Sequence, residues 1–379
     1  MTSTKETLLA MEKMQQEREE TSVCQKEECA AQADPFELSV VGATAFVASY
    51  TPIFYMTPEK TLRNLAAEET GAFYFQGTPF TILAEVGAYW QVRDSADGST
   101  GFVPRDSCLI NLPDVLPSAI YCNTNAEASR MRSCGKEIPG VTGEQLYSAR
   151  VFNNRLGREE YIMPVLYATA KKIAAAHKAA LAQGDALVIY ELFRMQAVQQ
   201  RVVRGLWALA EQDSQVMQGI TGAPWEMDWF IATGISTHQR GMAMDVGLAK
   251  VNASEALTLP GGMQCTQITD YTLHPMPTPI HELSPASASM AYPVTSRNDT
   301  DWRSTPLAPN MTEGARRLRD YCTGAGLTPL ASEWWHFNDL EAEQILGIES
   351  FLLPTAPESP FVWSPDGFVS VPKSPSERS

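Results

Sequence analysis

Apolar side chains recur at two different spacings along the chain, and the spacing separates helices from strands. Repeats three and four positions apart predict helices over residues 164–184, 196–212 and 312–325. Gly184 ends the first helix, and Thr312 caps the third. A continuous apolar run predicts a buried strand over residues 186–190, and a further strand is predicted over residues 246–251. The second half of the chain is therefore expected to mix helices with strands.

Between residues 40 and 112 the pattern changes to short β-type runs broken by turns. Strands are predicted over residues 45–50, 71–75, 79–83, 89–93 and 100–104. Asp97-Gly98 is typical of a hairpin turn. A strand with Trp90, this turn and the sequence Gly-Phe-Val-Pro that follows it together resemble a small bacterial SH3-like barrel. Trp90 and Phe102 are either the core of a module that packs on its neighbour or part of a module that binds the cell wall.

The length of 379 residues favours two folded units with tails over one ordinary domain. The predicted parts are a polar tail over residues 1–38 (helical in part, or disordered), an SH3-like β-barrel over 39–112, an α+β domain over 113–355 and a flexible tail over 356–379. The segment Leu112 to Pro117 is interpreted as the link between the two domains.

Composition and charge limit the classes of function. Hydrophobic residues make up 44% of the chain and charged residues 19%, which is typical of a globular protein. A formal net charge of −15 argues against a nucleic-acid partner, because no basic stripe is present to neutralise phosphates. No apolar run reaches the length of a signal peptide or a membrane span, so no membrane span is predicted in this chain.

The seven cysteines form no metal-binding Cys-x-x-Cys pair. Cys122 and Cys134 could bridge a loop, and the odd number leaves at least one thiol unpaired within the monomer. The redox compartment is left open, and no cysteine stands in a motif that predicts a nucleophile.

Two short motifs that lie far apart in the chain carry the candidate chemistry. They read Ser-Thr-His-Gln-Arg-Gly-Met-Ala-Met-Asp, ending at Asp245, and Glu-Trp-Trp-His, ending at His336. Two imidazoles and a carboxylate suit a catalytic zinc, which takes three protein ligands and leaves a fourth position for a water whose pKa falls to about 7. His238, Asp245 and His336 are the candidate zinc ligands, and Glu333 is the candidate general base.

The spacing within each motif agrees with this interpretation. Gly241, between His238 and Asp245, favours a turn that joins two short extended pieces converging on one ion. Glu333 and His336 are three residues apart and therefore face the same side of a helical turn.

The remaining histidines favour simpler interpretations. His177 is expected at the surface or edge of its helix rather than at a metal. His274 and His281 are alternative metal ligands, but neither stands in a complementary motif.

The joint pattern Ser-x-His-x-x-Gly-x-Ala-x-Asp followed by Glu-x-Trp-His resembles the zinc D-alanyl-D-alanine dipeptidase and carboxypeptidase family of the VanX/VanY type. Every position of the pattern is filled here, and the resemblance covers roughly residues 115–355. It implies an α+β zinc peptidase domain of the hedgehog and D,D-peptidase kind, preceded in this chain by the small all-β SH3-like barrel. It also implies Zn²⁺ as the cofactor and a D-Ala-containing peptide or peptidoglycan as the partner.

The resemblance implies roles for further residues. Arg194 follows a predicted strand where the family has an arginine that stabilises the negative charge developing on the scissile carbonyl oxygen; Met195 stands where the family usually has proline. Ser236 is expected to bind the substrate carboxylate or to orient a ligand, and Trp335 to wall the pocket. Glu282 lies in the segment where the family places a carboxylate that holds the substrate amine.

The sequence thus predicts a zinc peptidase that hydrolyses D-Ala-D-Ala, or the D-Ala-D-Ala end of a peptidoglycan stem, in cell-wall remodelling. Two alternatives stay open: an endopeptidase that cuts another stem bond, such as L-Ala-D-Glu, and a wall-binding protein whose zinc is structural. We expect a location in the cell envelope or outside the cell, with the signal or anchor absent from this chain, although a cytoplasmic location stays open.

Overall fold

The computed structural model describes residues 38–48, 51–55, 68–74, 77–260, 262–294 and 300–342. The described residues from Ser39 onward belong to one compact unit. The predicted tails, residues 1–38 and 356–379, lie outside the described residues except for Leu38.

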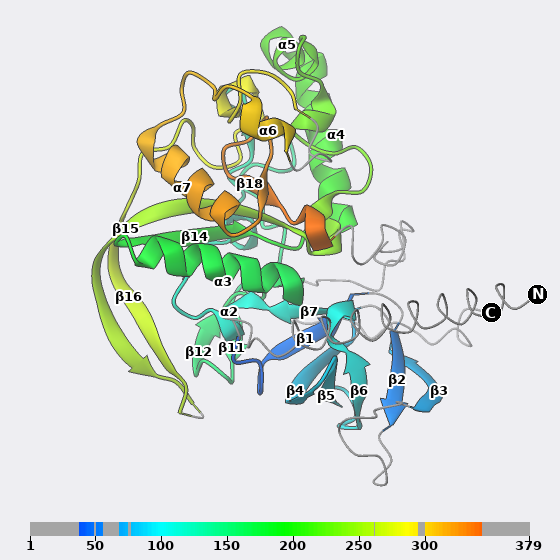
Figure 1. Cartoon of the computed structure of the whole chain (residues 1–379). Helices are drawn as coiled ribbons and strands as arrows, with labels where there is room; N and C mark the ends of the chain where they lie inside the picture. The colour runs from blue at the N-terminus through cyan, green and yellow to red at the C-terminus, as the bar shows by residue number, and fades with distance from the viewer. Residues whose placement is uncertain are drawn as a thin grey trace, which may run out of the picture. The chain divides into compact units, whose positions relative to one another are not determined.

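The amino-terminal region forms most of an antiparallel sheet with the strand order β13-β7-β1-β4-β5-β6-β2-β3 (Figure 1). Its strands are β1 (Thr44–Val47), β2 (Thr51–Tyr55), β3 (Glu68–Tyr74), β4 (Pro79–Val86), β5 (Tyr89–Asp94), β6 (Thr100–Pro104), β7 (Cys108–Asn111) and β13 (Pro164–Leu166). The predicted hairpin turn is present between β5 and β6, where Gly98 has a φ of 75° and the Asp94 amide donates to the Ser99 carbonyl.

The described strands follow an open path, with β13 at one end and β3 at the other, and do not close into a barrel. The SH3-like assignment therefore stays a prediction. Trp90 is fully buried, and its ring packs edge-to-face on Tyr167 at a centroid distance of 5.0 Å. The aromatic side chain singled out from the sequence thus belongs to the core between this sheet and the following helix.

The predicted link is a buried segment. Residues 112–115 form the short helix α2 (Leu112–Val115), all four of whose residues are buried. The carboxylate of Asp114 accepts hydrogen bonds from the Thr44 amide at 2.7 Å and from the side chains of Asn111 and Asn153. Apolar residues and a paired carboxylate therefore join the sheet to the chain that follows. The domain boundary itself stays a prediction.

A second sheet has the order β17-β18-β15-β14-β8, and β16 pairs with the outer half of β15. The strands are β8 (Ile120–Tyr121), β14 (Asp185–Glu191), β15 (Ala243–Thr258), β16 (Gln264–Leu273), β17 (Thr328–Pro329) and β18 (His336–Asn338). Only β8 runs parallel to its neighbour among the described pairs. β14 is buried along its whole length, as its continuous apolar run predicts.

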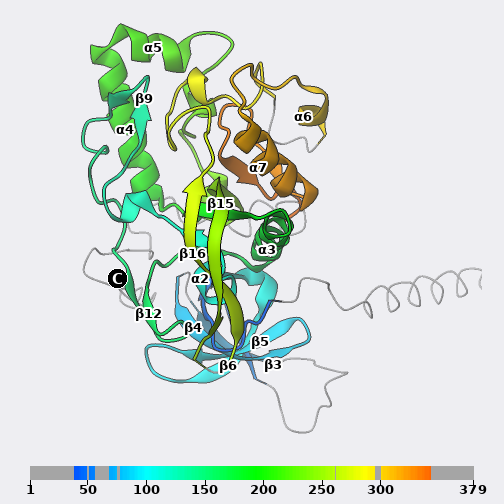
Figure 2. The same ribbon diagram turned by 90° about the vertical axis from the view of Figure 1, so that its left-hand side faces the viewer.

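Helices cover this sheet from two sides, as Figure 2 shows for β15, with α4 and α5 on one side and α6 and α7 on the other. The helices are α3 (Tyr167–Leu181), α4 (Gln196–Gln212), α5 (Ser214–Thr221), α6 (Asp301–Ser304) and α7 (Glu313–Gly324). α3 packs on β14 and α7 and also contacts β7 and β13 (Figure 1). The α+β expectation is met by this mixed α/β arrangement. Short pieces complete it: β9 (Arg132–Ser133), β10 (Lys136–Glu137), β11 (Val151–Asn153) and β12 (Arg158–Glu160).

Three expectations need correction. The first helix begins at Tyr167 rather than at residue 164, because residues 164–166 pair with β7 as strand β13. His177 is buried and not at the surface, since its ring accepts from the Leu187 amide and contacts Ser118 Oγ. Cys122 and Cys134 are free thiols and form no bridge.

None of the described helices is both long and apolar enough to span a bilayer.

Candidate metal centre and active site

The first histidine is presented by a short, firmly capped turn. His238 lies in the 3₁₀ helix η4 (Thr237–Arg240), not in an extended piece as expected. Ser236 caps it: the Ser236 hydroxyl accepts from the His238 amide, and the Gln239 side chain accepts from the Ser236 amide at 3.2 Å. The cap fixes the direction in which the His238 side chain leaves the backbone.

Gly241 ends the turn in the left-handed region, with a φ of 67°. A Cβ at this position would collide with the Leu109 side chain and lie 3.1 Å from the Leu166 amide nitrogen, which itself donates to the Gly241 carbonyl at 2.9 Å. Glycine is therefore required twice, by its backbone angles and by the close approach of β7 and β13.

The other two candidate ligands come from paired strands. Asp245 on β15 and His336 on β18 are register partners in an antiparallel pair, so their side chains leave the sheet next to each other. η4 precedes β15 directly and brings His238 to the same point. Two motifs that are distant in sequence thus converge at one point, as predicted.

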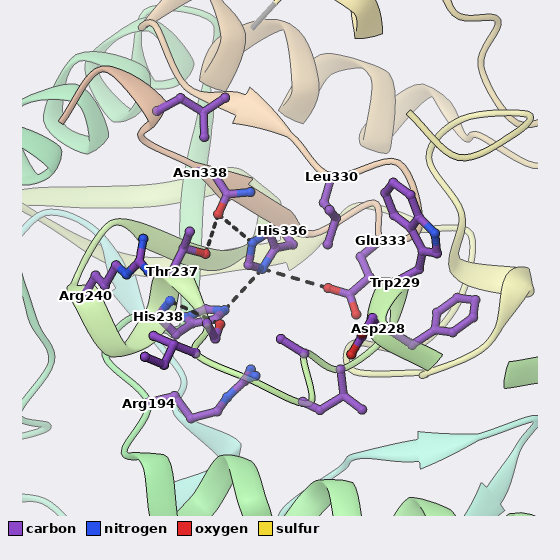
Figure 3. A pocket seen from close by; sticks show the side chains of 16 residues that line it. Arg194, Asp228, Trp229, Thr237, His238, Arg240, Leu330, Glu333, His336 and Asn338 are labelled. Atoms are coloured by element: carbon purple, nitrogen blue, oxygen red, sulfur yellow. Dashed lines mark hydrogen bonds and ion pairs between the residues drawn. The ribbon is translucent and has the colours of Figure 1, made fainter. Parts of the chain in front are cut away.

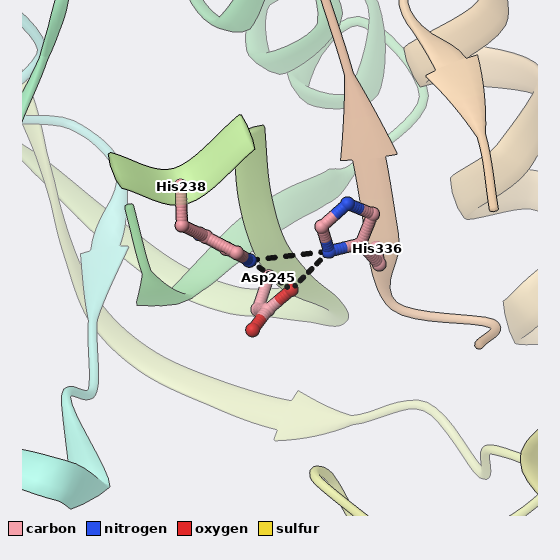
Figure 4. Close-up of side chains that lie close together, drawn as sticks. All are labelled: His238, Asp245 and His336. Atoms are coloured by element: carbon pink, nitrogen blue, oxygen red, sulfur yellow. Dashed lines mark hydrogen bonds and ion pairs between the residues drawn. The ribbon is translucent and has the colours of Figure 1, made fainter. Parts of the chain in front are cut away.

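The three side chains form a small triangle of possible ligand atoms (Figure 4). His336 Nδ1 lies 3.0 Å from Asp245 Oδ1 and 3.1 Å from His238 Nε2, and His238 Nε2 lies 3.3 Å from Asp245 Oδ1. His238 and Asp245 are each about 1% exposed. Water is therefore largely excluded from one side of the triangle.

The outer nitrogen of each ring is already engaged. His238 Nδ1 contacts the Leu192 carbonyl, and His336 Nε2 lies 2.9 Å from Asn338 Oδ1, which also accepts from the Thr237 hydroxyl at 2.6 Å. Both partners of the rings are acceptors, so the rings place their protons there. The lone pairs of His238 Nε2 and His336 Nδ1 then point toward each other and toward Asp245 Oδ1.

Three electron-pair donors that face one point repel one another unless a cation lies between them. Zn²⁺ bonds to imidazole nitrogen and carboxylate oxygen at about 2.0–2.2 Å, which puts neighbouring ligand atoms of a tetrahedron roughly 3.3–3.6 Å apart. The observed spacings of 3.0–3.3 Å come close to this geometry. The chemistry of the donor set and the positions of its protons therefore fit zinc.

The protonation states of His238 and Asp245 favour the binding of a cation at the triangle. Burial lowers the pKa of His238, with the Arg194 charge adding to the effect, so the imidazole is neutral at physiological pH. Burial alone would raise the pKa of Asp245, but the pKa lies well below its usual range, and the hydrogen bond that His281 donates to Oδ2 contributes to this lowering. The aspartate is therefore ionised.

Arg194 lies behind Asp245 and is nearly saturated with partners. Its Nη2 lies 3.2 Å from Asp245 Oδ2, its Nε and Nη2 both bond Glu191 Oε2, and its Nη1 donates to Gln199 Oε1 at 2.9 Å. Four of the five guanidinium N–H groups are thereby used. One N–H on Nη1 has no partner among the described residues, and Arg194 lines the pocket beside the triangle.

Glu333 lies beside the triangle without completing it, because its Oε2 is 3.8 Å from His336 Nδ1. The carboxyl is buried, and burial, followed by the negative charge of Asp245, raises its pKa well above the usual range. A carboxyl that holds its proton more tightly than usual is suited to proton transfer near neutral pH.

A pocket of about 250 Å³ opens at these groups (Figure 3). Its lining includes Arg194, Ser236, His238, Glu333 and His336, together with Asp228, Trp229, Thr237, Arg240, Leu330, Asn338 and Leu340. Asp228 and Trp229 belong to the 3₁₀ helix η3 (Met227–Trp229). In the view of Figure 3, Asp228 lies on the same side as Glu333, and Arg240 lies on the far side of His238.

Two of the predicted substrate-binding residues do not line this pocket. Trp335 is about 1% exposed and packs on Trp334 and His281, with ring centroids 5.2 and 6.1 Å away. Glu282 Oε2 accepts from the Gly135 amide at 3.1 Å. The structure brings neither side chain to the pocket, and their predicted roles gain no support from it.

Sequence reasoning overlooked the residues that support the ligands. Asn338, two residues beyond His336 on the same strand, could have been found from strand alternation, since the two share a face. Glu191 could have been suspected as the carboxylate at the end of the same strand that delivers Arg194. Asp228 carries no motif, and only its place in the pocket reveals it.

A buried donor set that is open to a pocket, with a carboxyl of raised pKa beside it, is the arrangement expected of a hydrolytic metal site, here in a mixed α/β protein. The model of the D-ala-D-ala dipeptidase family matches residues 138–350, more than half of the chain, and the chain belongs to this family. The resemblance found in the two motifs is thereby confirmed, and membership of this zinc peptidase family supports a metallopeptidase. A search of curated proteins found no match.

Proposed function

We propose that this protein is a zinc peptidase that removes D-alanine from D-Ala-D-Ala or from the D-Ala-D-Ala end of a peptidoglycan stem. The observation that carries the proposal is the triangle of Asp245 Oδ1 and two imidazole lone pairs, with Glu333 Oε2 3.8 Å from one corner. A purely structural zinc site needs no free carboxyl at its open side, which argues against the binding-protein alternative.

His238, Asp245 and His336 would hold the zinc ion, which when bound would supply Lewis-acid chemistry that activates water and polarises a carbonyl group. Glu333 takes a proton from the attacking water and returns it to the departing amine; its raised pKa suits both transfers. The remaining N–H of Arg194 Nη1 donates to the carbonyl oxygen as negative charge develops on it.

The charges of the pocket favour a small zwitterionic substrate. Besides Arg194, Glu333 and the two histidines, the charged residues of the lining are Asp228 and Arg240. An ammonium group pairs with a carboxylate, so Asp228, which is exposed at the pocket, is our candidate for the free amine of a dipeptide. The volume of about 250 Å³ is below the range of roughly 300–1,000 Å³ for drug-sized ligands and suits a compact substrate.

One observation favours a longer substrate as the second candidate. A further cavity of about 230 Å³ shares Leu340 with the catalytic pocket and is lined by Trp302, Arg303 and Glu341 among others. A stem peptide bound across Leu340 would reach both cavities. This arrangement would suit a carboxypeptidase or an endopeptidase that acts on peptidoglycan.

The test is product analysis with the zinc-loaded protein on three substrates: D-Ala-D-Ala, N-acetyl-D-Ala-D-Ala and a stem pentapeptide. D-Alanine from the free dipeptide alone would identify a dipeptidase, and D-alanine from the stem a carboxypeptidase. Cleavage at an internal stem bond alone would replace the proposal by an endopeptidase. If no substrate is cut while zinc stays bound, the peptidase proposal is wrong.

Asp228→Asn tests the amine site separately. We expect its KM for D-Ala-D-Ala to rise about 10- to 100-fold, because a hydrogen bond to a charged group is lost, and its KM for the acetylated peptide to stay unchanged. An equal effect on both substrates would exclude Asp228 as the partner of the amine.

We further propose that the amino-terminal sheet is a packing module, in line with the buried Trp90 and its contact with Tyr167. A location in the cell envelope or outside the cell fits a peptidoglycan substrate and is part of the same proposal.

A further inference from the structure

His281 is a buried histidine whose backbone adopts a conformation that side chains rarely take. Its φ is +62°, in the left-handed region, and the residue is about 1% exposed. A side chain destabilises this backbone conformation, because its Cβ comes too close to the following carbonyl oxygen. Contacts with the surrounding structure therefore stabilise this backbone conformation.

The backbone and the ring of His281 are both fixed. The Arg132 amide donates to the His281 carbonyl at 3.1 Å. The ring lies between Tyr190 and Trp335, with centroid distances of 6.5 and 6.1 Å and edge-to-face geometry in both cases. Rotation of the imidazole would disturb two aromatic neighbours, so its Nε2 atom has a defined direction.

That direction is the outer oxygen of the aspartate at the candidate metal centre. His281 Nε2 lies 3.2 Å from Asp245 Oδ2, and an ionised carboxylate accepts only, so Nε2 carries the proton and donates. Arg194 Nη2 donates to the same oxygen, also at 3.2 Å. Two donors from different segments thus hold Oδ2 and leave Oδ1 directed at the two ligand imidazoles.

Glu191, Asp245 and His281 also come close together and form a second group of possible metal ligands. The position of Arg194 argues against a metal ion at this second group. Its guanidinium bonds both carboxylates and already supplies their positive charge. A divalent ion there would have to displace a buried arginine that is held by four hydrogen bonds.

We propose that His281 is a positioning residue of the metal centre: its Nε2–H holds Asp245 so that Oδ1 faces the ion. The inference rests on the proposed zinc site but not on the substrate. Groups that orient a metal ligand from behind typically change metal affinity 10- to 100-fold when they are removed.

The experiment is zinc competition against a chelator, with thermal unfolding as the measure of folding, on His281→Phe and His281→Gln. Phenylalanine keeps a ring between the two aromatic neighbours but has no donor; the amide of glutamine restores a donor at a similar reach. We expect His281→Phe to bind zinc about 10- to 100-fold more weakly and His281→Gln to recover most of the affinity. His274→Phe is the matched control, since His274 Nε2 contacts Asp185 Oδ1 at 2.9 Å far from the site, and its zinc affinity should equal that of the wild type.

A His281→Phe protein that is folded and binds zinc within twofold of the wild type overturns the inference. The same holds if His281→Gln is folded but binds no better than the phenylalanine variant. Should His281→Phe fail to fold, His281→Asn replaces it, because asparagine tolerates the left-handed backbone and its side chain is too short to reach Asp245. If the wild type itself bound no zinc, the proposed function would fall first and this inference with it.

Discussion

Strands β14 and β15 carry a buried aspartate at each end of their pairing, Asp185 at one end and Asp245 at the other. At the first end every neighbour is a donor. Asp185 Oδ1 lies 2.9 Å from His274 Nε2, and its Oδ2 accepts from the Tyr321 hydroxyl at 2.9 Å and from Arg317. Each contact pairs a proton with a lone pair, so the cluster is complete without any ion.

At the second end, Oδ2 of Asp245 is also satisfied by donors, but Oδ1 is not. It faces the ring nitrogens of His238 and His336, whose protons lie on the opposite sides of the rings. The two clusters contain similar residue types. The difference is where the protons are, and that is fixed by the acceptors behind each ring. A list of nearby histidines and carboxylates does not identify a metal site, whereas the direction of their lone pairs does.

The strongest test of the comparison is the same substitution at both ends. We expect Asp245→Asn to weaken zinc binding about 100- to 10,000-fold and to abolish activity. This corresponds to a loss of roughly 3–5 kcal/mol of binding free energy, because Asp245 is the charged member of the three ligands. Asp185→Asn should keep zinc affinity and activity and lower the free energy of unfolding by about 1–3 kcal/mol, because His274 and Arg317 lose a charged acceptor.

Zinc competition and thermal unfolding of both variants check this pair of expectations. Equal zinc affinity in the two variants would mean that the triangle is an ordinary ion cluster like its counterpart.

The second test separates the ligands from the carboxyl beside them. Glu333→Gln should lower kcat about 100- to 10,000-fold, the usual contribution of general acid–base catalysis, and leave zinc affinity within a few fold. The reason is geometric: Glu333 Oε2 is 3.8 Å from the nearest ligand atom and is not a corner of the triangle. Steady-state kinetics beside a zinc titration measure both effects, and a variant that loses its metal would show that Glu333 is a ligand.

Sequence reasoning selected the residues that the structure brings together in the triangle, because the two motifs contain them and Gly241 marks the turn between His238 and Asp245. It also placed α4 at its observed bounds and the cap of α7 at Thr312, whose side chain accepts from the Ala315 amide. Both features are local, and local spacing determines them.

The misses are non-local. Residues 164–166 suit a helix or a strand equally, and only the distant strand β7 decides between the two. His281 holds a ligand through a contact that no spacing within a segment reveals. The site residues keep their predicted roles as predictions, and the structure adds the groups that orient them.

His177 gives a third case for comparison, because this buried histidine has neither a cation nor a carboxylate partner among the residues that the structure describes. Burial lowers its pKa from 6.5 to about 4. Between these two pH values the ring is neutral in the folded state but binds a proton in the unfolded chain. Its contribution to stability is therefore complete above pH 6.5 and is lost as the pH falls toward 4. The shift corresponds to roughly 3 kcal/mol.

His177→Gln should remove the part of the acid destabilisation that comes from protonation of this ring. The free energy of unfolding, measured by chemical denaturation, should fall less between pH 7 and pH 4 in the variant than in the wild type, by up to about 3 kcal/mol. An unchanged difference would mean that the ring is protonated in the fold despite its burial.

The smallest expected effect concerns the cap that directs His238 toward the metal. Two roles were predicted for Ser236, and it both lines the pocket and accepts from the His238 amide at 3.3 Å. If it acts as a cap, Ser236→Ala lowers the free energy of unfolding by about 1 kcal/mol and weakens zinc binding slightly, with KM unchanged. If it binds the substrate carboxylate, KM rises while zinc affinity stays the same.

The contact with the His238 amide favours the first outcome, because a hydroxyl that accepts from the backbone has one proton left and cannot replace an arginine as the main partner of a carboxylate. A KM increase of tenfold or more with unchanged stability would reverse that assignment and make the same turn responsible for holding both the metal and the substrate.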